Sequence, residues 1–161
     1  MTTPIAFAPI PSAPIPEGPE HRAAITRRIQ EATGLDEAAL ERLVRAFYER
    51  ARRDDQIGFL FDKVTDWEAH IERITAFWSS VALSTGRYSG QPMAAHAKLP
   101  LAPAHFRRWL ALFEQTVREV CTGEAGANHL MAKAERIASS LAMGIAVMHG
   151  ELPSRDRSPA L

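Results

Sequence analysis

The sequence predicts an all-α domain, and two observations support this prediction. From Glu20 to Gly150, apolar residues recur at spacings of three and four, which is the period of amphipathic helices. Over the same stretch, no segment combines β-branched residues, period-two alternation and a hairpin turn, as strands would require. The chain has 161 residues, which is enough for one domain whose core needs no disulfide.

The two ends of the chain differ from this helical middle. The first 19 residues contain six of the 11 prolines and almost no charge, and they show no helical or strand period. We therefore expect an extended or disordered arm over residues 1–19, a helical domain over residues 20–150 and a disordered tail over residues 151–161.

Composition argues against several classes of protein. Lys and Arg together number 19, as do Asp and Glu, and no long run of one sign exists. Nucleic acids and membrane surfaces are therefore not expected as partners. The single cysteine, Cys121, cannot form an internal disulfide, and neither a secretory signal nor a membrane-spanning apolar run is present. We expect a cytoplasmic protein.

The first two helices are predicted from their ends. A helix over residues 20–32 would end at Gly34, because the residue after a helix often adopts a positive φ. Asp36 can cap a second helix, and Leu35 can pack on Leu40 across that cap. The apolar face of this second helix comprises Leu40, Leu43, Val44, Phe47, Tyr48 and Ala51.

The third helix is predicted to begin at a capping box, because Thr65 precedes Glu68 by three residues. His70 lies at the edge of its apolar stripe, and a glycine-rich turn follows the helix. The stripe comprises Trp67, Ile71, Ile74, Phe77, Trp78 and Val81.

Two long helices complete the domain. Pro103 suits the first turn of one of them. Thr122 and Gly123 interrupt the pattern before the other, which Gly150 ends. The apolar face of the first comprises Phe106, Trp109, Leu110, Phe113, Val117 and Val120, and that of the second comprises Leu130, Met131, Ala134, Ile137, Ala138, Leu141, Ile145 and Met148.

Between the third helix and these two, His96 lies alone among Ala, Met and Leu residues. Pro92 and Pro100 confine its segment to about two helical turns, so it cannot grow into a long packing helix. An imidazole held there in apolar surroundings indicates a ligand presented to something large and hydrophobic.

Five side chains together suggest a pocket. Tyr48, His70, His96 and Trp109 place polar tips on or beside apolar helix faces, and Phe61 follows the loop after the second helix. Each also has an ordinary explanation, because buried Tyr and Trp residues usually satisfy one hydrogen bond and half-buried histidines are common in cores.

The order of these residues resembles that of the truncated haemoglobins, most closely their third group. The resemblance covers roughly residues 25–149, and its most specific part is the segment around His96. It implies a globin-like fold, a truncated two-over-two helical sandwich around haem. The matching segments are FYERARRDDQIGFLFDKV with Phe47, Tyr48 and Phe61, WEAHIERITAFWSSVAL with His70, and GQPMAAHAKLPLAPAHFRRWLALF with His96 and Trp109.

The resemblance also implies a role for each residue. His96 would be the proximal ligand of the iron in haem b, and Phe61 would pack on the porphyrin. Tyr48, His70 and Trp109 would line the distal side, where a diatomic ligand binds, with Trp109 also against the haem. Donors there would hold a ligand that acquires partial negative charge.

Several alternatives stay open at this point. His70 could gate the pocket, donate a hydrogen bond or ligate the iron. His105 is a rival proximal ligand, although it begins a long helix. Arg87, Tyr88 and Lys98 could meet haem propionates or be solvated groups beside a turn. The remaining histidines are expected in solvent: His21, His129 and His149.

The predicted function is the binding of oxygen or nitric oxide at ferrous haem iron. Nitric oxide detoxification, as by a dioxygenase, or peroxidase-like activity is an open addition that would need a reductase to supply electrons. The alternative is a non-haem helical interaction or regulatory module, in which the aromatic faces form only core. A di-iron bundle would need paired Glu-x-x-His motifs, which the sequence lacks.

Overall fold

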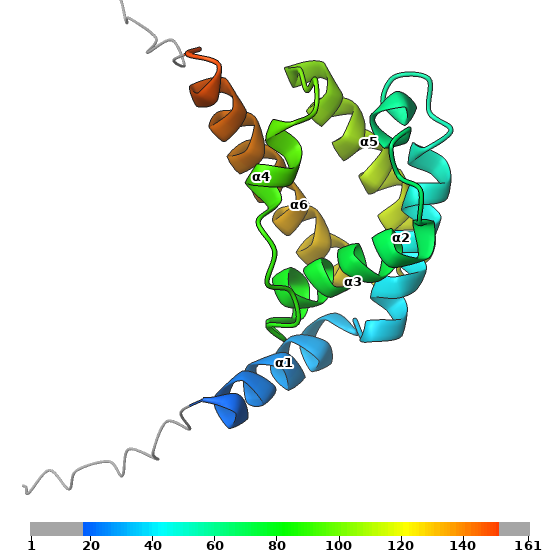
Figure 1. The fold of residues 1–161 in the computed structure, drawn as a ribbon. Coiled ribbons are helices and arrows are strands. Elements are labelled where there is room, and N and C mark those ends of the chain that lie inside the picture. The colour runs from blue at the N-terminus through cyan, green and yellow to red at the C-terminus, as the bar shows by residue number, and fades with distance from the viewer. Residues whose placement is uncertain (1–17, 152–161) are drawn as a thin grey trace, which may run out of the picture.

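The computed structural model describes residues 18–151 (Figure 1). Over this range the chain is helical and contains no strand, so the all-α prediction is confirmed. The predicted arm and tail lie almost wholly outside the described residues and stay predictions. The elements are α1 (Pro19–Thr33), α2 (Glu37–Ala51), the 3-10 helix η1 (Gly58–Phe61), α3 (Trp67–Leu83), α4 (Pro92–Ala97), α5 (Pro103–Val120) and α6 (Glu124–Met148).

The four long helices of the domain pack in two pairs. Helix α2 packs against α3, and α5 packs against α6. The pairs are joined because α2 also packs on α5 and α3 on α6, which is the expected two-over-two layering. Helix α1 lies against α3 and α6 at one edge, and the short α4 packs on α6 (Figure 1).

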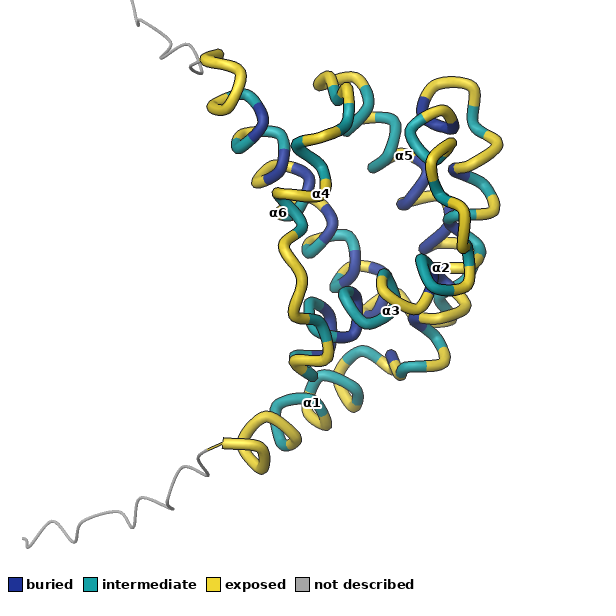
Figure 2. Tube along the Cα trace, viewed as in Figure 1, coloured by how far each residue is buried: buried dark blue, intermediate teal, exposed yellow. Residues whose placement is uncertain are grey.

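The core lies where the two layers face each other, and buried segments of α2, α5 and α6 turn inward there (Figure 2). Phe113 of α5 is at its centre, because its ring stacks on Trp109 at an interplanar angle of 8° and on Trp78 at 15°. The largest fully buried side chains include Leu40, Leu43, Phe47, Leu83, Phe113 and Leu130.

The ends of the first two helices form as predicted. Gly34 has φ 71°, and its N–H donates to the carbonyl of Gln30 at 2.8 Å, which closes α1. Asp36 accepts the N–H of Ala39 at 2.8 Å and caps α2. Leu35, beside the cap, is buried in the core.

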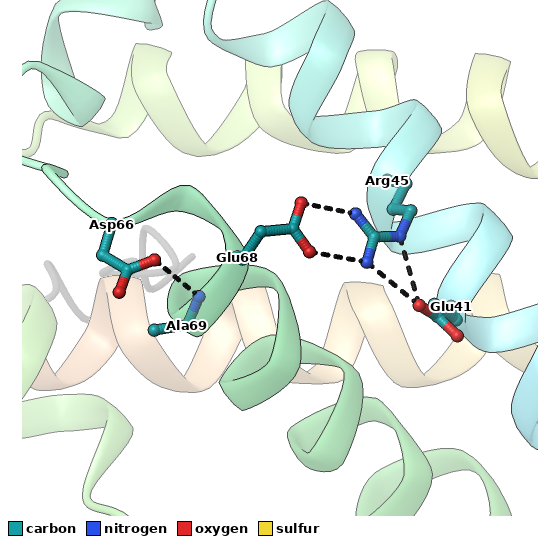
Figure 3. Close-up of polar contacts among 5 residues, drawn as sticks. All are labelled: Glu41, Arg45, Asp66, Glu68 and Ala69. Carbon is teal, nitrogen blue, oxygen red and sulfur yellow. Dashed lines mark hydrogen bonds and ion pairs between the residues drawn. The ribbon is translucent and has the colours of Figure 1, made fainter.

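The start of α3 differs from the prediction, because Asp66 caps it and Thr65 does not. The Asp66 carboxylate accepts the N–H of the third helical residue at 3.0 Å. Glu68 does not complete a capping box, since both its oxygens accept from Arg45 of α2 at 2.9 Å, while Arg45 also binds Glu41 (Figure 3). The predicted box is wrong because a partner on another helix takes the Glu68 carboxylate.

Two expectations about α6 are also wrong. His129 is half-buried rather than solvated, because its Nε2 donates to the Ala82 carbonyl of α3 at 2.8 Å. Met148 is 62% exposed instead of lying on the buried stripe, since the last turn of α6 extends past its neighbours (Figure 1). His21 and His149 are exposed, as expected.

The turn after α2 is tied to α5 and thereby positions η1. The Asp54 side chain, only 5% exposed, accepts from Arg108 at 2.6 and 3.0 Å. Its other oxygen accepts the N–H groups of Gln56 and Ile57. These bonds, that from Arg108 above all, lower the pKa of Asp54. The turn therefore places Phe61 beside α2.

Candidate functional site

Aromatic side chains from α2, η1 and α3 meet in one cluster. The Tyr48 ring lies edge-on to Phe61, with centroids 5.5 Å apart, and edge-on to His70, with centroids 5.2 Å apart. Trp67 completes the cluster, 5.5 Å from His70 and 6.2 Å from Tyr48. All four side chains are half-buried. The fold thus brings together Tyr48, Phe61 and His70, which the sequence had suggested as parts of one pocket.

Trp109 joins this cluster through Phe47. The Phe47 ring lies edge-on to both Tyr48 and Trp109, with centroids 5.1 Å and 5.6 Å away. Trp109 is half-buried and stacks on Phe113. Its orientation is therefore set by core packing on α5 rather than by direct contact with the tyrosine.

The two titratable groups of the cluster are uncharged at neutral pH. Burial lowers the pKa of His70 below its ordinary value of about 6.5, and the positive charge of Arg73 lowers it further. Burial raises the pKa of Tyr48 well above its ordinary value. The phenol therefore keeps its proton and can act as a hydrogen-bond donor.

One polar atom of the cluster is buried without a partner. The Nε2 atom of His70 has no hydrogen-bond partner among residues 18–151. Leaving such an atom unsatisfied costs about 1–3 kcal/mol, so most buried polar atoms in folded proteins are paired. An unpaired nitrogen at this place is suited to contact a bound group.

His96 presents one free nitrogen from α4. Its half-buried ring has Nδ1 2.6 Å from the carbonyl oxygen of Pro92, one turn earlier. A carbonyl oxygen can only accept, so Nδ1 carries the proton. In the neutral ring, Nε2 then has a free lone pair, which is the arrangement found for metal-ligating histidines.

His105, the rival ligand, is used differently. Its Nδ1 accepts the N–H of Ala102 at 2.9 Å and so caps the start of α5. In the neutral ring the proton is then on Nε2, which leaves neither nitrogen with a free lone pair. The ring also packs against Phe59, with centroids 5.5 Å apart. This geometry favours His96 over His105 as a ligand.

Arg87, in the loop before α4, is already paired. Arg87 donates to Glu37 of α2 at 2.7 Å, and Glu37 also accepts from the buried Ser79 hydroxyl. Tyr88 packs edge-on against Phe77, and Lys98 is exposed. Arg87 therefore ties the loop to α2, which the sequence did not indicate.

The side chains present fit a haem. One imidazole has a free Nε2, the cluster offers half-buried aromatic walls, and a second imidazole has an unpaired nitrogen. Within the part of the chain that the structure describes, no group of three or more His, Cys, Asp or Glu side chains could hold a metal ion. A macrocycle that needs a single protein ligand suits this donor set.

Comparison with known proteins decides the family. The bacterial-like globin profile matches residues 28–143, which is more than half of the chain. The chain belongs to the bacterial-like globins. This globin is 32% identical over 111 residues to the group 3 truncated haemoglobin ctb of Campylobacter jejuni, with 65% of this chain and 87% of that relative covered.

A solved structure agrees with this assignment. The crystal structure of group III truncated haemoglobin from Campylobacter jejuni matches this globin with a TM-score of 0.63 at 32% identity, over 67% of this chain and 89% of that chain. The resemblance to the truncated haemoglobins and the globin-like fold are thus confirmed. As a globin, the protein binds haem and, through it, gas ligands. Over residues 18–151, no helix has both the length and the apolar character needed to span a membrane.

Trp67 is the part of this globin's cluster that sequence reasoning missed. Its spacing predicts a place on the apolar stripe of α3 and does not by itself indicate the pocket. A signal was present, because Trp67 precedes His70 by three residues and therefore shares its helix face. The same spacing is common in ordinary cores, so it does not by itself distinguish a pocket wall from a core side chain.

Proposed function

We propose that this globin binds oxygen or nitric oxide reversibly at a haem b whose proximal ligand is His96. The observation that supports this most is the 2.6 Å contact from His96 Nδ1 to the Pro92 carbonyl, because it leaves Nε2 free to ligate. Haem, when bound, supplies a ferrous iron that takes a diatomic ligand.

On the proximal side, the position of His96 depends on the contacts that orient and anchor α4. Pro92 occupies the first turn of this six-residue helix, where its missing N–H costs nothing. Its carbonyl orients the His96 ring and makes the ligating nitrogen more basic. Met93 lies against Gly144 of α6, so the short helix is anchored to a long one.

The distal side is formed by the aromatic cluster. Phe61 packs on the porphyrin, and Tyr48 and Trp109 donate hydrogen bonds to a ligand that carries partial negative charge. Such charge-assisted bonds contribute about 1.5–3 kcal/mol, which slows ligand escape by about ten- to a hundredfold. The apolar rings around them exclude water, which would otherwise promote oxidation of the iron.

His70 is the third distal group. Its neutral ring and unpaired Nε2 suit a hydrogen bond to the ligand, a gate beside it or a direct bond to the iron. Of these three roles, we favour donation to the ligand, because it uses the buried Nε2 without any movement of the ring. Turnover of nitric oxide or peroxide, electron supply by a reductase and a cytoplasmic location stay predictions of the sequence.

The test is an absorption spectrum of the full chain reconstituted with haem, in ferric, ferrous and CO-saturated forms. We expect a Soret band that His96→Ala shifts or abolishes, and that imidazole added to His96→Gly restores. The matched control is His105→Gln, which should leave the Soret band unchanged. A wild-type protein that takes up no haem would contradict the proposal and favour the non-haem interaction module. A Soret band unaffected by His96→Ala would remove His96 from the proximal role.

A further inference from the structure

A cavity of about 280 Å³ lies on the outer side of the aromatic cluster. Two of its lining residues, Phe61 and Trp67, also contact Tyr48. Because both rings line the cavity and contact Tyr48, they form a boundary between the cavity and the side chains proposed to line the distal side. The cavity is lined by Arg52, Gly58, Phe61, Asp62, Val64 and Trp67.

A cation holds one of the two separating rings. The guanidinium carbon of Arg52 lies 4.4 Å from the centroid of the Trp67 ring. Such cation–π contacts at exposed sites are weak, and the Arg52 side chain is 40% exposed. The stack can therefore open and close without unfolding anything around it.

The backbone on both sides of Trp67 is held firmly. Asp66, just before it, caps α3, and Glu68, just after it, is bound by Arg45 of α2 (Figure 3). Movement of the indole is therefore a side-chain rotation and not a shift of the helix. The backbone at Gly58, another lining residue, is also constrained, because a Cβ there would come within 2.9 Å of the Arg52 carbonyl oxygen.

Rotation of the indole would join the cavity to the distal group. The Trp67 ring lies 5.5 Å from His70, whose Nε2 is buried and unpaired. The cavity is large for a diatomic molecule, since one water takes about 30 Å³ in the liquid. A small uncharged gas needs only such a space and a momentary gap between the rings.

We propose that this cavity is the outer chamber through which a diatomic gas reaches the distal side, with Trp67 as its movable inner wall and Arg52 as the latch on that wall. The inference rests on the proposed function, because the molecule that passes is the gas that the haem site binds. Asp62 and Arg52 are the charged residues of its lining, and Phe61 is the stationary half of the inner wall.

The test uses flash photolysis of the CO complex of the full-length ferrous globin. Arg52→Met removes the cation but keeps the length of the side chain, and we expect bimolecular CO rebinding to become about two- to fivefold faster, as loss of one cation–π contact predicts. Trp67→Ala should accelerate it further. The control is Arg53→Met, because Arg53 also pairs with Glu49 but is 77% exposed and is not stacked on Trp67.

A second measurement does not depend on gas binding. Exchange of the Trp67 indole N–H with solvent, read by NMR, should be faster in Arg52→Met and unchanged in Arg53→Met. If Trp67→Ala does not fold, Trp67→Phe replaces it, with a smaller acceleration expected because a wall remains.

The outcomes separate this inference from the proposed function. If the Arg52 and Trp67 variants rebind CO at the same rate as the wild type, the chamber proposal is wrong, while haem and gas binding stand. Faster CO rebinding in His70→Ala would then place the route at His70. A wild-type protein that forms no CO complex would overturn the proposed function and the chamber with it.

Discussion

The side chain of Met93 on α4 lies directly against the backbone of Gly144 on α6. A Cβ at position 144 would overlap the Met93 methyl group and come within 2.9 Å of its sulfur. Because α4 also carries His96, this contact ties the helix of the proposed proximal ligand to the long helix α6.

Gly144→Ala should therefore disturb the proximal helix more than the overall fold. Alanine gains about 1 kcal/mol of helix propensity over glycine, which offsets the cost of displacing a flexible Met side chain. We expect a nearly unchanged free energy of unfolding, measured with urea, but faster loss of haem to a scavenger protein. The double variant Met93→Ala/Gly144→Ala should lose haem more slowly than Gly144→Ala alone, because the overlap is removed. Equal haem loss in wild type and Gly144→Ala would show that the contact does not position His96.

Tyr48→Phe tests the distal donor. Because the Tyr48 phenol keeps its proton, it can donate to the ligand, and the substitution removes this donor while keeping the aromatic ring. We expect oxygen dissociation, measured by stopped flow, to become about ten- to a hundredfold faster. Tyr88→Phe is the control, since Tyr88 packs on Phe77 instead of joining the cluster. An unchanged dissociation rate would remove Tyr48 from the distal role.

His70 should titrate below its ordinary pKa of about 6.5. Burial lowers the pKa of His70 first and the charge of Arg73 second, so Arg73→Gln should raise it towards 6.5. The folded state then binds fewer protons than the unfolded state, and the contribution of His70 to stability is present above pH 6.5 and lost as pH falls through its lowered pKa. NMR titration of the ring protons in the CO-saturated protein checks this. A pKa above 6.5 would contradict the burial argument.

Gly126 should be essential to the contact between α1 and α6. It is buried, and a Cβ there would come within 2.8 Å of the Thr33 carbonyl oxygen and 3.3 Å of Leu35. Gly126→Ala should thus destabilise the protein by about 1–3 kcal/mol despite the better helix propensity of alanine. Gly123→Ser, at a position with nothing within 4 Å, is the matched control and should be neutral or stabilising as a helix cap. Urea denaturation of both variants is the measurement.

The helices could be predicted from the sequence because their signals are local. The closing turn at Gly34, the cap at Asp36 and the start at Pro103 each involve groups within one turn of the chain. The same locality explains the error at Thr65, since the spacing to Glu68 was right but Arg45 comes from another helix. Two candidate partners for one carboxylate cannot be ranked from spacing alone.

The candidate site was predicted through its order of residues and its resemblance to a family, and not through geometry. That Tyr48, Phe61 and His70 lie within one cluster follows only once α2, η1 and α3 are packed. Trp67 was missed for this reason, because a stripe residue becomes a pocket wall only if its neighbours leave a cavity beside it. The sequence predicts the helix face on which Trp67 lies, but it does not predict the cavity beside that face.

By itself, the sequence determined the all-α class, the short proline-bounded helix of His96 and the faces on which the polar tips lie, because periodicity and caps act within a few residues. The contacts that fix the protons of the two rival histidines are also local, because His96 meets the carbonyl four residues earlier and His105 meets an N–H three residues earlier, so the free lone pair belongs to His96. Only the tertiary structure decided the polar contacts between helices. His129 became an inter-helix tie only when the Ala82 carbonyl was brought within 2.8 Å. A polar atom takes its role from the partner that folding places at hydrogen-bond distance, and residue spacing does not reveal which partner that is.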